Sequence, residues 1–287
     1  MQIRDLEANL GVALVERRPG EAKMTEIGRE IARRGDEMLA AARDLQDFAR
    51  QRVGLLNGRF GLGVIPSLAP YLLPRLLPEL QARHPELRLE LHERQTHQLL
   101  DEVKSGSLDA AMVALPVDDN DLEAVELFRD RFLLAVPTDD PRPDHALISA
   151  EDIDVGQLLL LEDGHCLRDQ ALAFCATSRI RNAAAATTGF AASSLNTVMQ
   201  MVAGGFGITL IPQIAAGVEG RDTRVRFLQM AEPQPSRTIG LVSRRSSPRK
   251  ADFAALADVV KHCMAEGDGD EAGLVSPLVS AQPAPAI

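Results

Sequence analysis

Apolar and polar positions in the first fifty residues follow helical and hairpin patterns. Apolar residues three and four apart predict a short helix over residues 2–10 that ends at Gly11. Two short runs then flank residues 17–20, whose Arg-Arg-Pro-Gly composition is typical of a hairpin turn. Thr25 is placed as the N-cap of a long helix that lasts to about Gln51.

This long helix carries one narrow apolar stripe, interrupted only at Arg34. The stripe consists of Ile27, Ile31, Met38, Ala42, Leu45 and Ala49. A stripe this narrow favours packing against a partner helix over burial in a globular core. The helix is therefore expected to serve self-association.

From Arg59 onward, short apolar strands alternate with helices. Strands are expected at 60–65, 87–93, 109–115, 132–137, 157–162, 207–212 and 238–243. Helices are expected at 71–84, 98–104, near Ile153, from Cys166, at 194–203 and at 249–264, with a further apolar stretch near Ala183. This alternation predicts mostly parallel sheets with covered faces. Residues 265–287 combine Gly, Pro and acidic residues without periodicity, which predicts a disordered tail.

Composition places the chain among globular proteins. Its 287 residues are 45% hydrophobic and 25% charged, and they contain no run of about 18 apolar residues, so no membrane partner is expected. The net charge is -10, yet residues 1–58 contain ten basic and ten acidic side chains, so contact with nucleic acid must come from this neutral N-terminal piece. Three cysteines and a start without a secretory pattern indicate the cytoplasm.

Cys166 and Cys175 are the candidates for thiol chemistry. They are nine positions apart, so a continuous helix would separate them by about 13.5 Å of rise and place them on opposite sides. A disulfide needs Cα atoms within about 7 Å, so it would close only if the helix came apart. Cys166 follows His165 at a predicted helix start, a position that favours thiolate, as would the charge of Arg168. From spacing alone, two unrelated buried thiols are the commoner interpretation.

Other motifs predict no cofactor and no metal. Cys263 falls on the apolar face of the last helix and is expected in the core. The glycines of GGFGITLIP precede a strand, whereas a dinucleotide fingerprint follows one. His92 and Glu93 are adjacent in a strand and face opposite ways, so together with His97 they are not expected to bind a metal.

The motifs of this chain resemble those of LysR-type transcriptional regulators. Matches to the back half of their winged helix-turn-helix are Ile3, Leu6, Glu7, Leu10, Gly11, Leu14, Arg17, Met24, Thr25 and Gly28. Further along, IPSLAPYLLP, HERQTHQLL, LLLEDGHCLRDQALAFC, GGFGITLIP and RTIGLV resemble the hydrogen-peroxide-sensing members of this family. The resemblance runs from residue 2 to about residue 264.

This resemblance implies an α/β fold in which a partial winged helix-turn-helix and a linker helix precede a two-subdomain sensor of periplasmic-binding-protein type. Its expected parts are the helix-turn-helix remnant at 1–24, the linker helix and hinge at 25–58, the sensor at 59–264 and the tail at 265–287. Within the sensor, subdomain I is expected at about 59–130 and 237–264, and subdomain II at about 131–236.

The resemblance also implies the roles of the site residues. Cys166 matches the peroxidatic cysteine, which peroxide oxidises to sulfenic acid, and Cys175 matches the resolving cysteine, which condenses with it. The residues at peroxide-binding positions are Ser67, Thr96, His165, Asp169 and Arg237. Seen alone, the hydroxyl residues would be strand-end caps and Arg237 a surface ion pair. Ser67 stands where Thr is commoner, which keeps the hydroxyl and removes one methyl.

DNA contact is expected from Arg4, Arg17 and Arg18. In the family, the first helices and the start of the recognition helix lie upstream of what is here residue 2. A misplaced start codon and a real truncation both explain this, and we favour the first. With only the rear of the recognition helix, residues 1–287 are expected to bind DNA weakly.

The implied function is that of a regulator that senses hydrogen peroxide through a Cys166–Cys175 switch and controls oxidative-stress genes. Its expected partners are promoter DNA, RNA polymerase, a second copy in a homodimer or homotetramer, and glutaredoxin or thioredoxin as reductant. The alternative within the family is a sensor of a small metabolite in the cleft between subdomains, which would need neither cysteine. A thiol peroxidase is the alternative from another class, and the chain lacks the thioredoxin-like pattern that such enzymes carry.

Overall fold

A short helix and a two-stranded hairpin form the N-terminal unit of the protein. The computed structural model describes residues 3–18, 21–50, 54–177 and 191–271. Helix α1 (Ile3–Leu10) is followed by the antiparallel strands β1 (Val15–Arg18) and β2 (Glu21–Met24). The predicted helix and hairpin are thus confirmed, and the tip of the turn at 19–20 lies outside the described residues.

One carboxylate fixes α1 to the hairpin. The side chain of Glu7 accepts hydrogen bonds from the backbone N–H groups of Leu14 at 2.7 Å and Val15 at 3.1 Å. These two bonds hold the start of β1 against the helix. They also hold the pKa of Glu7 below its usual value.

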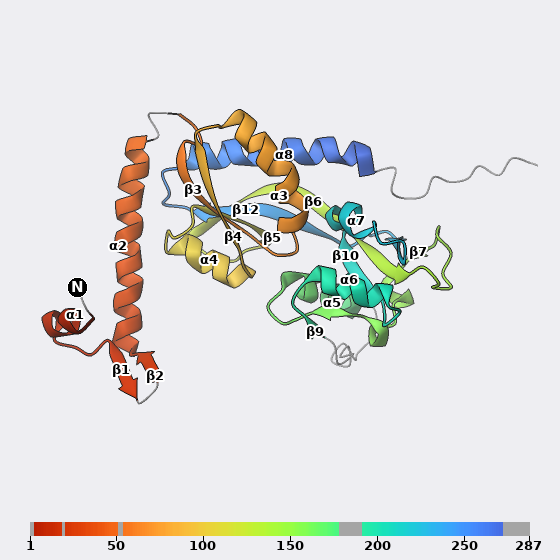
Figure 1. The fold of residues 1–287 in the computed structure, drawn as a ribbon, viewed down its shortest axis with the longest axis horizontal. Coiled ribbons are helices and arrows are strands. Elements are labelled where there is room, and N and C mark those ends of the chain that lie inside the picture. The colour runs from red at the N-terminus through yellow and green to blue at the C-terminus, as the bar shows by residue number, and fades with distance from the viewer. Residues whose placement is uncertain (1–2, 19–20, 51–53, 178–190, 272–287) are drawn as a thin grey trace, which may run out of the picture.

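Helix α2 (Glu26–Arg50) links this unit to the rest of the chain. The Thr25 side chain accepts a hydrogen bond from the Gly28 N–H at 2.9 Å, which confirms the predicted N-cap. The helix stands beside the body of the protein, the part from residue 54 to residue 271, and the N-terminal unit lies at its far end (Figure 1). It meets the body where Ala40 is buried and the Arg43 side chain donates to the Gly106 carbonyl at 2.6 Å.

An eight-stranded sheet runs through the described part of the body. Its order is β4-β3-β5-β12-β6-β11-β7, and β10 also pairs with β6. The strands are β3 (Gly58–Val64), β4 (Leu87–Glu93), β5 (Ala110–Leu115), β6 (Leu122–Pro137), β7 (Leu147–Ile148), β10 (Thr209–Pro212), β11 (Val225–Met230) and β12 (Ser236–Arg244). The helices of the body are α3 (Ala69–Arg83), α4 (Thr96–Lys104), α5 (Cys166–Thr177), α6 (Leu195–Ala203), α7 (Gln213–Glu219) and α8 (Lys250–Glu271). The short strands β8 (Leu160–Leu161) and β9 (Ala191–Ala192) pair separately.

The expectation of mostly parallel sheets is wrong for the central strands. Strand β3 runs parallel to β4 and β5, but β12 is antiparallel to β5 and β6, and β6 is antiparallel to β10 and β11. The reason is that one long strand serves both halves of the sheet. Residues 122–131 of β6 pair with β12, and residues 132–137 pair with β10 and β11.

Several boundaries also differ from the expected ones. Strand β6 begins at Leu122 rather than residue 132, and α7 and β11 were not predicted. The helix expected near Ile153 is a pair of 3-10 turns, Ala150–Asp152 and Val155–Gln157. Helix α8 continues to Glu271, so the predicted disorder does not begin at residue 265. The apolar stretch near Ala183 and the end of the tail lie outside the described residues.

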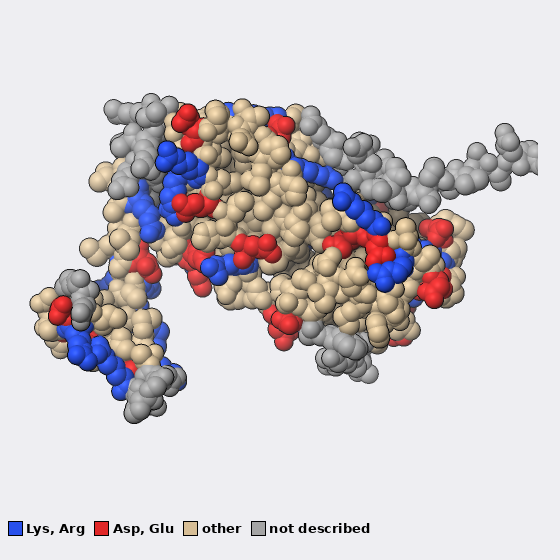
Figure 2. Space-filling model, viewed as in Figure 1, with Lys and Arg blue, Asp and Glu red and all other residues tan. Residues whose placement is uncertain are grey.

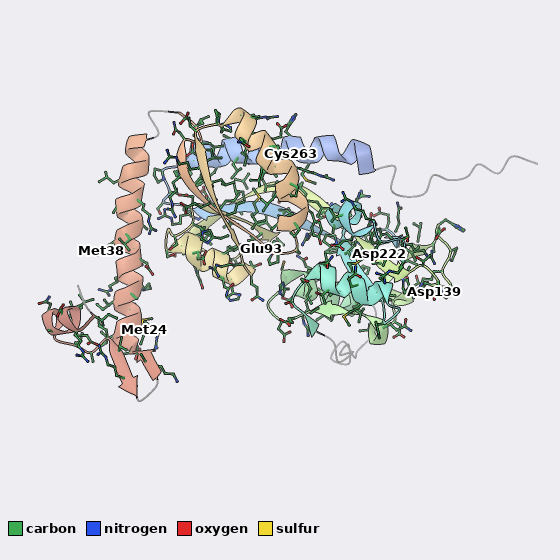
Figure 3. All side chains as sticks on the ribbon, viewed as in Figure 1. Met24, Met38, Glu93, Asp139, Asp222 and Cys263 are labelled. Atoms are coloured by element: carbon green, nitrogen blue, oxygen red, sulfur yellow. The ribbon has the colours of Figure 1, made fainter. Side chains whose placement is uncertain are left out.

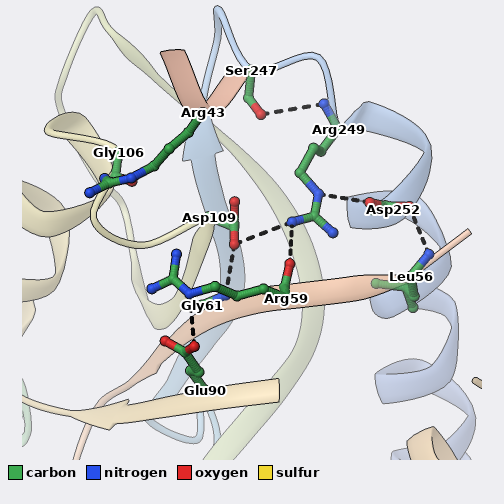
Figure 4. Close-up of polar contacts among 10 residues, drawn as sticks. All are labelled: Arg43, Leu56, Arg59, Gly61, Glu90, Gly106, Asp109, Ser247, Arg249 and Asp252. Carbon is green, nitrogen blue, oxygen red and sulfur yellow. Dashed lines mark hydrogen bonds and ion pairs between the residues drawn. The ribbon is translucent and has the colours of Figure 1, made fainter. Parts of the chain in front are cut away.

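A buried polar cluster anchors the segment that follows α2 (Figure 4). The Arg249 guanidinium contacts Asp252 at 2.8 Å and Asp109 at 3.3 Å, and it donates to the Arg59 carbonyl at 2.9 Å. Asp252 in turn accepts a hydrogen bond from the Leu56 N–H at 2.8 Å. The hinge after α2 is thereby tied to β3 and α8.

The core of the body lies between its sheet and its helices. Cys263 of α8 is 6% exposed there, which confirms its predicted core position (Figure 3). On the face shown in Figure 2, charges of both signs are interspersed over the body, and basic side chains gather on the N-terminal unit. None of the described helices is long and apolar enough to cross a membrane.

Candidate functional site

A small cavity lies where three loops meet at one edge of the sheet. Its volume is about 10 Å³, room for about one water-sized molecule. It is lined by Ile65, Pro66, Ser67, Gln95, Thr96, Gly164, His165, Cys166 and Leu167. Because β3 and β4 are parallel, the segments that follow them reach the same edge. Four residues expected to act together, Ser67, Thr96, His165 and Cys166, therefore share this cavity.

Arg237 reaches the cavity through Ser67. Its Nη1 donates to the Ser67 hydroxyl at 2.7 Å, and its Nη2 donates to the Ser67 carbonyl at 3.1 Å. Arg237 is 3% exposed and Ser67 is 4% exposed. Arg237 is thus a buried cation and not the surface ion pair that its position in the sequence alone would suggest.

Thr96, which lines this cavity, carries an unused polar atom. Its Oγ1 is buried and has no hydrogen-bond partner among the described residues. Leaving a buried polar group without a partner costs about 1–3 kcal/mol, and such groups are few in folded proteins. A small ligand that donates or accepts a hydrogen bond would satisfy it.

Gly164 brings the start of α5 close to the start of α4. Its φ of +91° is the left-handed conformation that favours glycine, and a Cβ there would lie 2.6 Å from the Gln95 Oε1. The Gln95 side chain also reaches the Asp163 carbonyl at 3.5 Å. A side chain at position 164 would be strained by this backbone conformation and would displace the end of the Gln95 side chain.

The two candidate cysteines lie on one continuous helix, as predicted. Cys166 is the first residue of α5 and is partly exposed at the cavity, whereas Cys175 is 1% exposed in the core. Neither cysteine forms a disulfide in this structure, and nine helical positions correspond to a rise of about 13.5 Å. Burial raises the pKa of the Cys175 thiol, so Cys175 remains protonated at neutral pH in this conformation.

Asp169 is not brought to the cavity. It is exposed in the first turn of α5 and is absent from the cavity lining. The charge of Arg168, expected beside Cys166, is held by Asp163 at 2.9 Å, and its Nη1 donates to the Leu161 carbonyl. Neither residue adds to the polar groups around the cavity.

The basic residues expected at DNA lie on the N-terminal unit. Arg4 is exposed, and Arg17 is also exposed, 3.8 Å from the Glu7 carboxylate. The side chain of Arg18 lies outside the described residues. These basic residues and the cavity are far apart in the sequence. Helix α2 is the element that connects the N-terminal unit, which carries the basic residues, to the body, which contains the cavity.

Three buried residues near Arg237 escaped the sequence analysis. Asp130 forms an ion pair with Arg237 at 2.9 Å, and the Tyr71 hydroxyl donates to Glu219 at 2.7 Å. Burial raises the pKa of Asp130, which Arg237 opposes, and burial together with the Glu219 contact raises the pKa of Tyr71. The available signal for Asp130 was an acidic residue two positions before the predicted apolar strand at 132–137, but its pairing with Arg237 depends on strand register.

Comparison with known families identifies most of the chain. The sequence pattern of the LysR substrate binding domain matches residues 53–265. The DNA-binding transcriptional dual regulator OxyR of Escherichia coli strain K12 is 39% identical over 260 residues, which are 91% of this chain and 84% of that protein. The HTH-type transcriptional regulator EstR of Acinetobacter baylyi is 34% identical and covers 92% of this chain and 86% of its own.

Solved structures agree with this assignment. A cysteine-to-serine mutant of OxyR from Corynebacterium glutamicum, with hydrogen peroxide bound, has a TM-score of 0.75 at 31% identity. The match covers 99% of this chain and 88% of that one. The fold similarity therefore includes the N-terminal unit and α2 as well as the body.

Proposed function

The chain belongs to the LysR family of transcriptional regulators, and from this premise we propose that it senses hydrogen peroxide at Cys166 and transmits the signal through a disulfide with Cys175. The observation that carries the proposal is the cavity beside Cys166. A buried hydroxyl without a partner, on Thr96, and the Arg237–Ser67 pair both adjoin it. These groups match a small ligand with two hydroxyls.

The reaction takes place in two steps. The Cys166 thiolate attacks one peroxide oxygen, the O–O bond breaks, and the other oxygen leaves as hydroxide and takes up a proton to become water. Cys166 is then a sulfenic acid. Cys175 attacks its sulfur, the S–O bond breaks, and a second water leaves as the disulfide forms. Two thiols have been oxidised and one peroxide reduced. Donors beside the cavity stabilise the negative charge that develops on the leaving oxygen.

The second step requires a change of structure. Cys175 is buried on the same helix as Cys166, about 13.5 Å further along it, and a disulfide needs Cα atoms within about 7 Å. Helix α5 must therefore come apart before the bond closes. This requirement couples the chemistry to the shape of the body, which is what a sensor needs.

Family membership alone does not select peroxide as the signal, since EstR also matches this chain. The cavity beside Cys166 favours peroxide, because it has room for a water-sized molecule next to a thiol. A metabolite sensor would also have no use for a partly exposed thiol at a cavity and a second thiol on the same helix. We therefore favour peroxide over a metabolite.

In this proposal the chain acts as a regulator and not as a turnover peroxidase. Its partners are promoter DNA, contacted through Arg4, Arg17 and Arg18, and RNA polymerase. Glutaredoxin or thioredoxin returns the disulfide to thiols in the cytoplasm. The chain passes from subdomain I (about 59–130 and 237–264) to subdomain II (about 131–236) within β6 and returns at the start of β12, and in this proposal the switch alters how the two subdomains meet.

Peptide mass spectrometry without reductant tests the switch. After one equivalent of peroxide we expect a Cys166–Cys175 link, because Cys166 adjoins the cavity and Cys175 shares its helix. Cys166→Ser abolishes the reaction, and Cys175→Ser leaves a sulfenic acid at Cys166 that dimedone traps. Cys263→Ser is the matched control and leaves the link intact. A link that involves Cys263, or a Cys166 that stays reduced, contradicts the proposal. Steady-state turnover with thioredoxin or glutaredoxin should be slow.

A further inference from the structure

Asp130 and Arg237 are directly opposite each other in the sheet. They are paired residues in the antiparallel register of β6 and β12, so their side chains project from the same face. Asp130 and Arg237 are each 3% exposed. Two opposite charges thus sit out of water at the centre of the body, next to the wall of the cavity.

The carboxylate of Asp130 holds one edge of the guanidinium. Its Oδ2 accepts from Arg237 Nε at 3.0 Å and lies 2.9 Å from Nη2. Its Oδ1 accepts from the Ile214 N–H at 3.1 Å, at the start of α7. The carboxylate is therefore itself fixed by backbone, and it fixes the rotation of the planar guanidinium about its long axis.

The adjacent edge of the guanidinium, which shares Nη2, is directed at Ser67. Nη1 donates one hydrogen to the Ser67 hydroxyl at 2.7 Å, and Nη2 donates to the Ser67 carbonyl at 3.1 Å. Nη1 has two hydrogens, so the bond to Ser67 leaves a second one on the same nitrogen. A turn of the guanidinium would break both contacts with Ser67, whose side chain lines the cavity.

We propose that Asp130 is a positioning residue for peroxide reduction, which holds Arg237 in the one orientation that presents Nη1 to Ser67, whose side chain lines the cavity. This inference rests on the proposed function. Asp130 touches neither the cavity nor Cys166 and acts only through Arg237. With a neutral or displaced side chain at position 130, the guanidinium of Arg237 is free to rotate away from Ser67. It then no longer faces the peroxide oxygen that leaves as hydroxide.

The test compares two reactions of Cys166 in a Cys175→Ser background, where the sulfenic acid accumulates. Reduction of peroxide needs an oriented donor at the leaving oxygen, whereas alkylation by iodoacetamide does not. For Asp130→Asn we expect the second-order rate constant with peroxide to fall roughly 10- to 100-fold, the range of a misplaced donor at a developing anion. The rate of alkylation should change by less than about twofold.

Arg237→Gln should give a similar loss, and the double variant Asp130→Asn with Arg237→Gln should lose no more than Arg237→Gln alone. If Asp130→Asn does not fold, as shown by circular dichroism, Asp130→Glu replaces it. Asp130→Glu keeps the charge but moves the carboxylate by one methylene, so a lower peroxide rate with unchanged alkylation is again expected.

A peroxide rate in the folded variant equal to that of the parent would overturn the inference, as would equal losses in both reactions, which indicate a structural role. These outcomes are separate from failure of the proposed function. In that case the parent protein itself, with Asp130 intact, would show no reaction at Cys166 with peroxide.

Discussion

Thr96 is the residue whose surroundings most directly indicate a bound ligand. Its hydroxyl oxygen is buried without a hydrogen-bond partner among the described residues, and the residue lines a cavity with room for a water-sized molecule. If Thr96 had only a structural role, a buried hydroxyl without a partner would lower the stability of the fold and contribute nothing to function. The same oxygen beside Cys166 would hydrogen-bond a bound peroxide, so its value lies in the reaction and not in stability.

Replacing Thr96 by Val separates these two roles, because Val has the same shape without the hydroxyl. We expect the free energy of unfolding of the reduced protein to stay the same or rise by up to about 1 kcal/mol. Oxidation of Cys166 by peroxide should slow roughly 10-fold or more, since one donor or acceptor is lost at the reacting molecule. Urea titration measures the first quantity and stopped-flow kinetics the second.

Thr96→Ser is the control for this prediction. It retains the hydroxyl and should react with peroxide at nearly the parent rate. Destabilisation of Thr96→Val by more than about 1 kcal/mol with no change in the peroxide rate would show that the hydroxyl serves the fold.

At the scale of elements, α5 carries one feature that favours its opening. The Gln170 side chain, between the two cysteines, has a buried Oε1 without a partner among the described residues. Unwinding would return the Gln170 amide to water and recover part of the about 1–3 kcal/mol that its burial costs. This buried amide therefore lowers the free-energy cost of opening the helix.

Hydrogen exchange should reveal this opening. In the reduced protein the amides of α5 are expected to be protected, and after formation of the Cys166–Cys175 disulfide they should exchange at least about 10-fold faster. The sulfenic acid form of Cys175→Ser, which cannot close the bond, should keep the protection. Helix α3 serves as an internal reference that does not change. A disulfide seen by mass spectrometry with α5 still fully protected would contradict the helix argument.

The elements predicted from the sequence were those with a strong local pattern. Helix α2, with its cap at Thr25, and strand β4 follow directly from local residues. Strand β6 was found only in its apolar part after residue 131, because its first part mixes buried and exposed positions without a regular period and contains charged residues. The antiparallel pairing of β6 with β12 joins residues more than a hundred positions apart, and no local pattern encodes such a partner.

The residues of the site likewise divide into those that a local sequence pattern indicates and those that only resemblance or strand register identifies. The two cysteines were visible as candidates, but their spacing alone favoured unrelated thiols, and only the resemblance to peroxide sensors selected Ser67, Thr96, His165 and Arg237. Asp130 was missed because its role depends on the register opposite Arg237. Asp169 was included by resemblance, although its side chain is exposed outside the cavity lining.

At the scale of the whole molecule, α2 presents an apolar face that the described residues of its own chain leave exposed. Met38 is 75% exposed and Leu45 is 72% exposed on this helix, while Ala40, on another side, is buried against the turn at Gly106 (Figures 1 and 3). The Arg249 cluster fixes the hinge after α2, so both contacts hold the helix at the side of the body. The face with Met38 and Leu45 is thus left for a second copy of the chain.

We therefore expect residues 1–287 to self-associate through this face. Exposed apolar side chains seven residues apart are the pattern with which two helices pack, since each pair fills the holes of its partner. Light scattering at micromolar concentration should give a mass above the 31.1 kDa of one chain. The double variant Met38→Glu with Leu45→Glu should lower that mass or weaken association at least about 10-fold, because charges would be buried at the seam. Ala32→Glu, exposed and about a third of a turn away from Met38 around the helix, is the control and should associate like the parent. A parent mass of one chain, or equal loss in the control, would show that α2 does not pair the molecule.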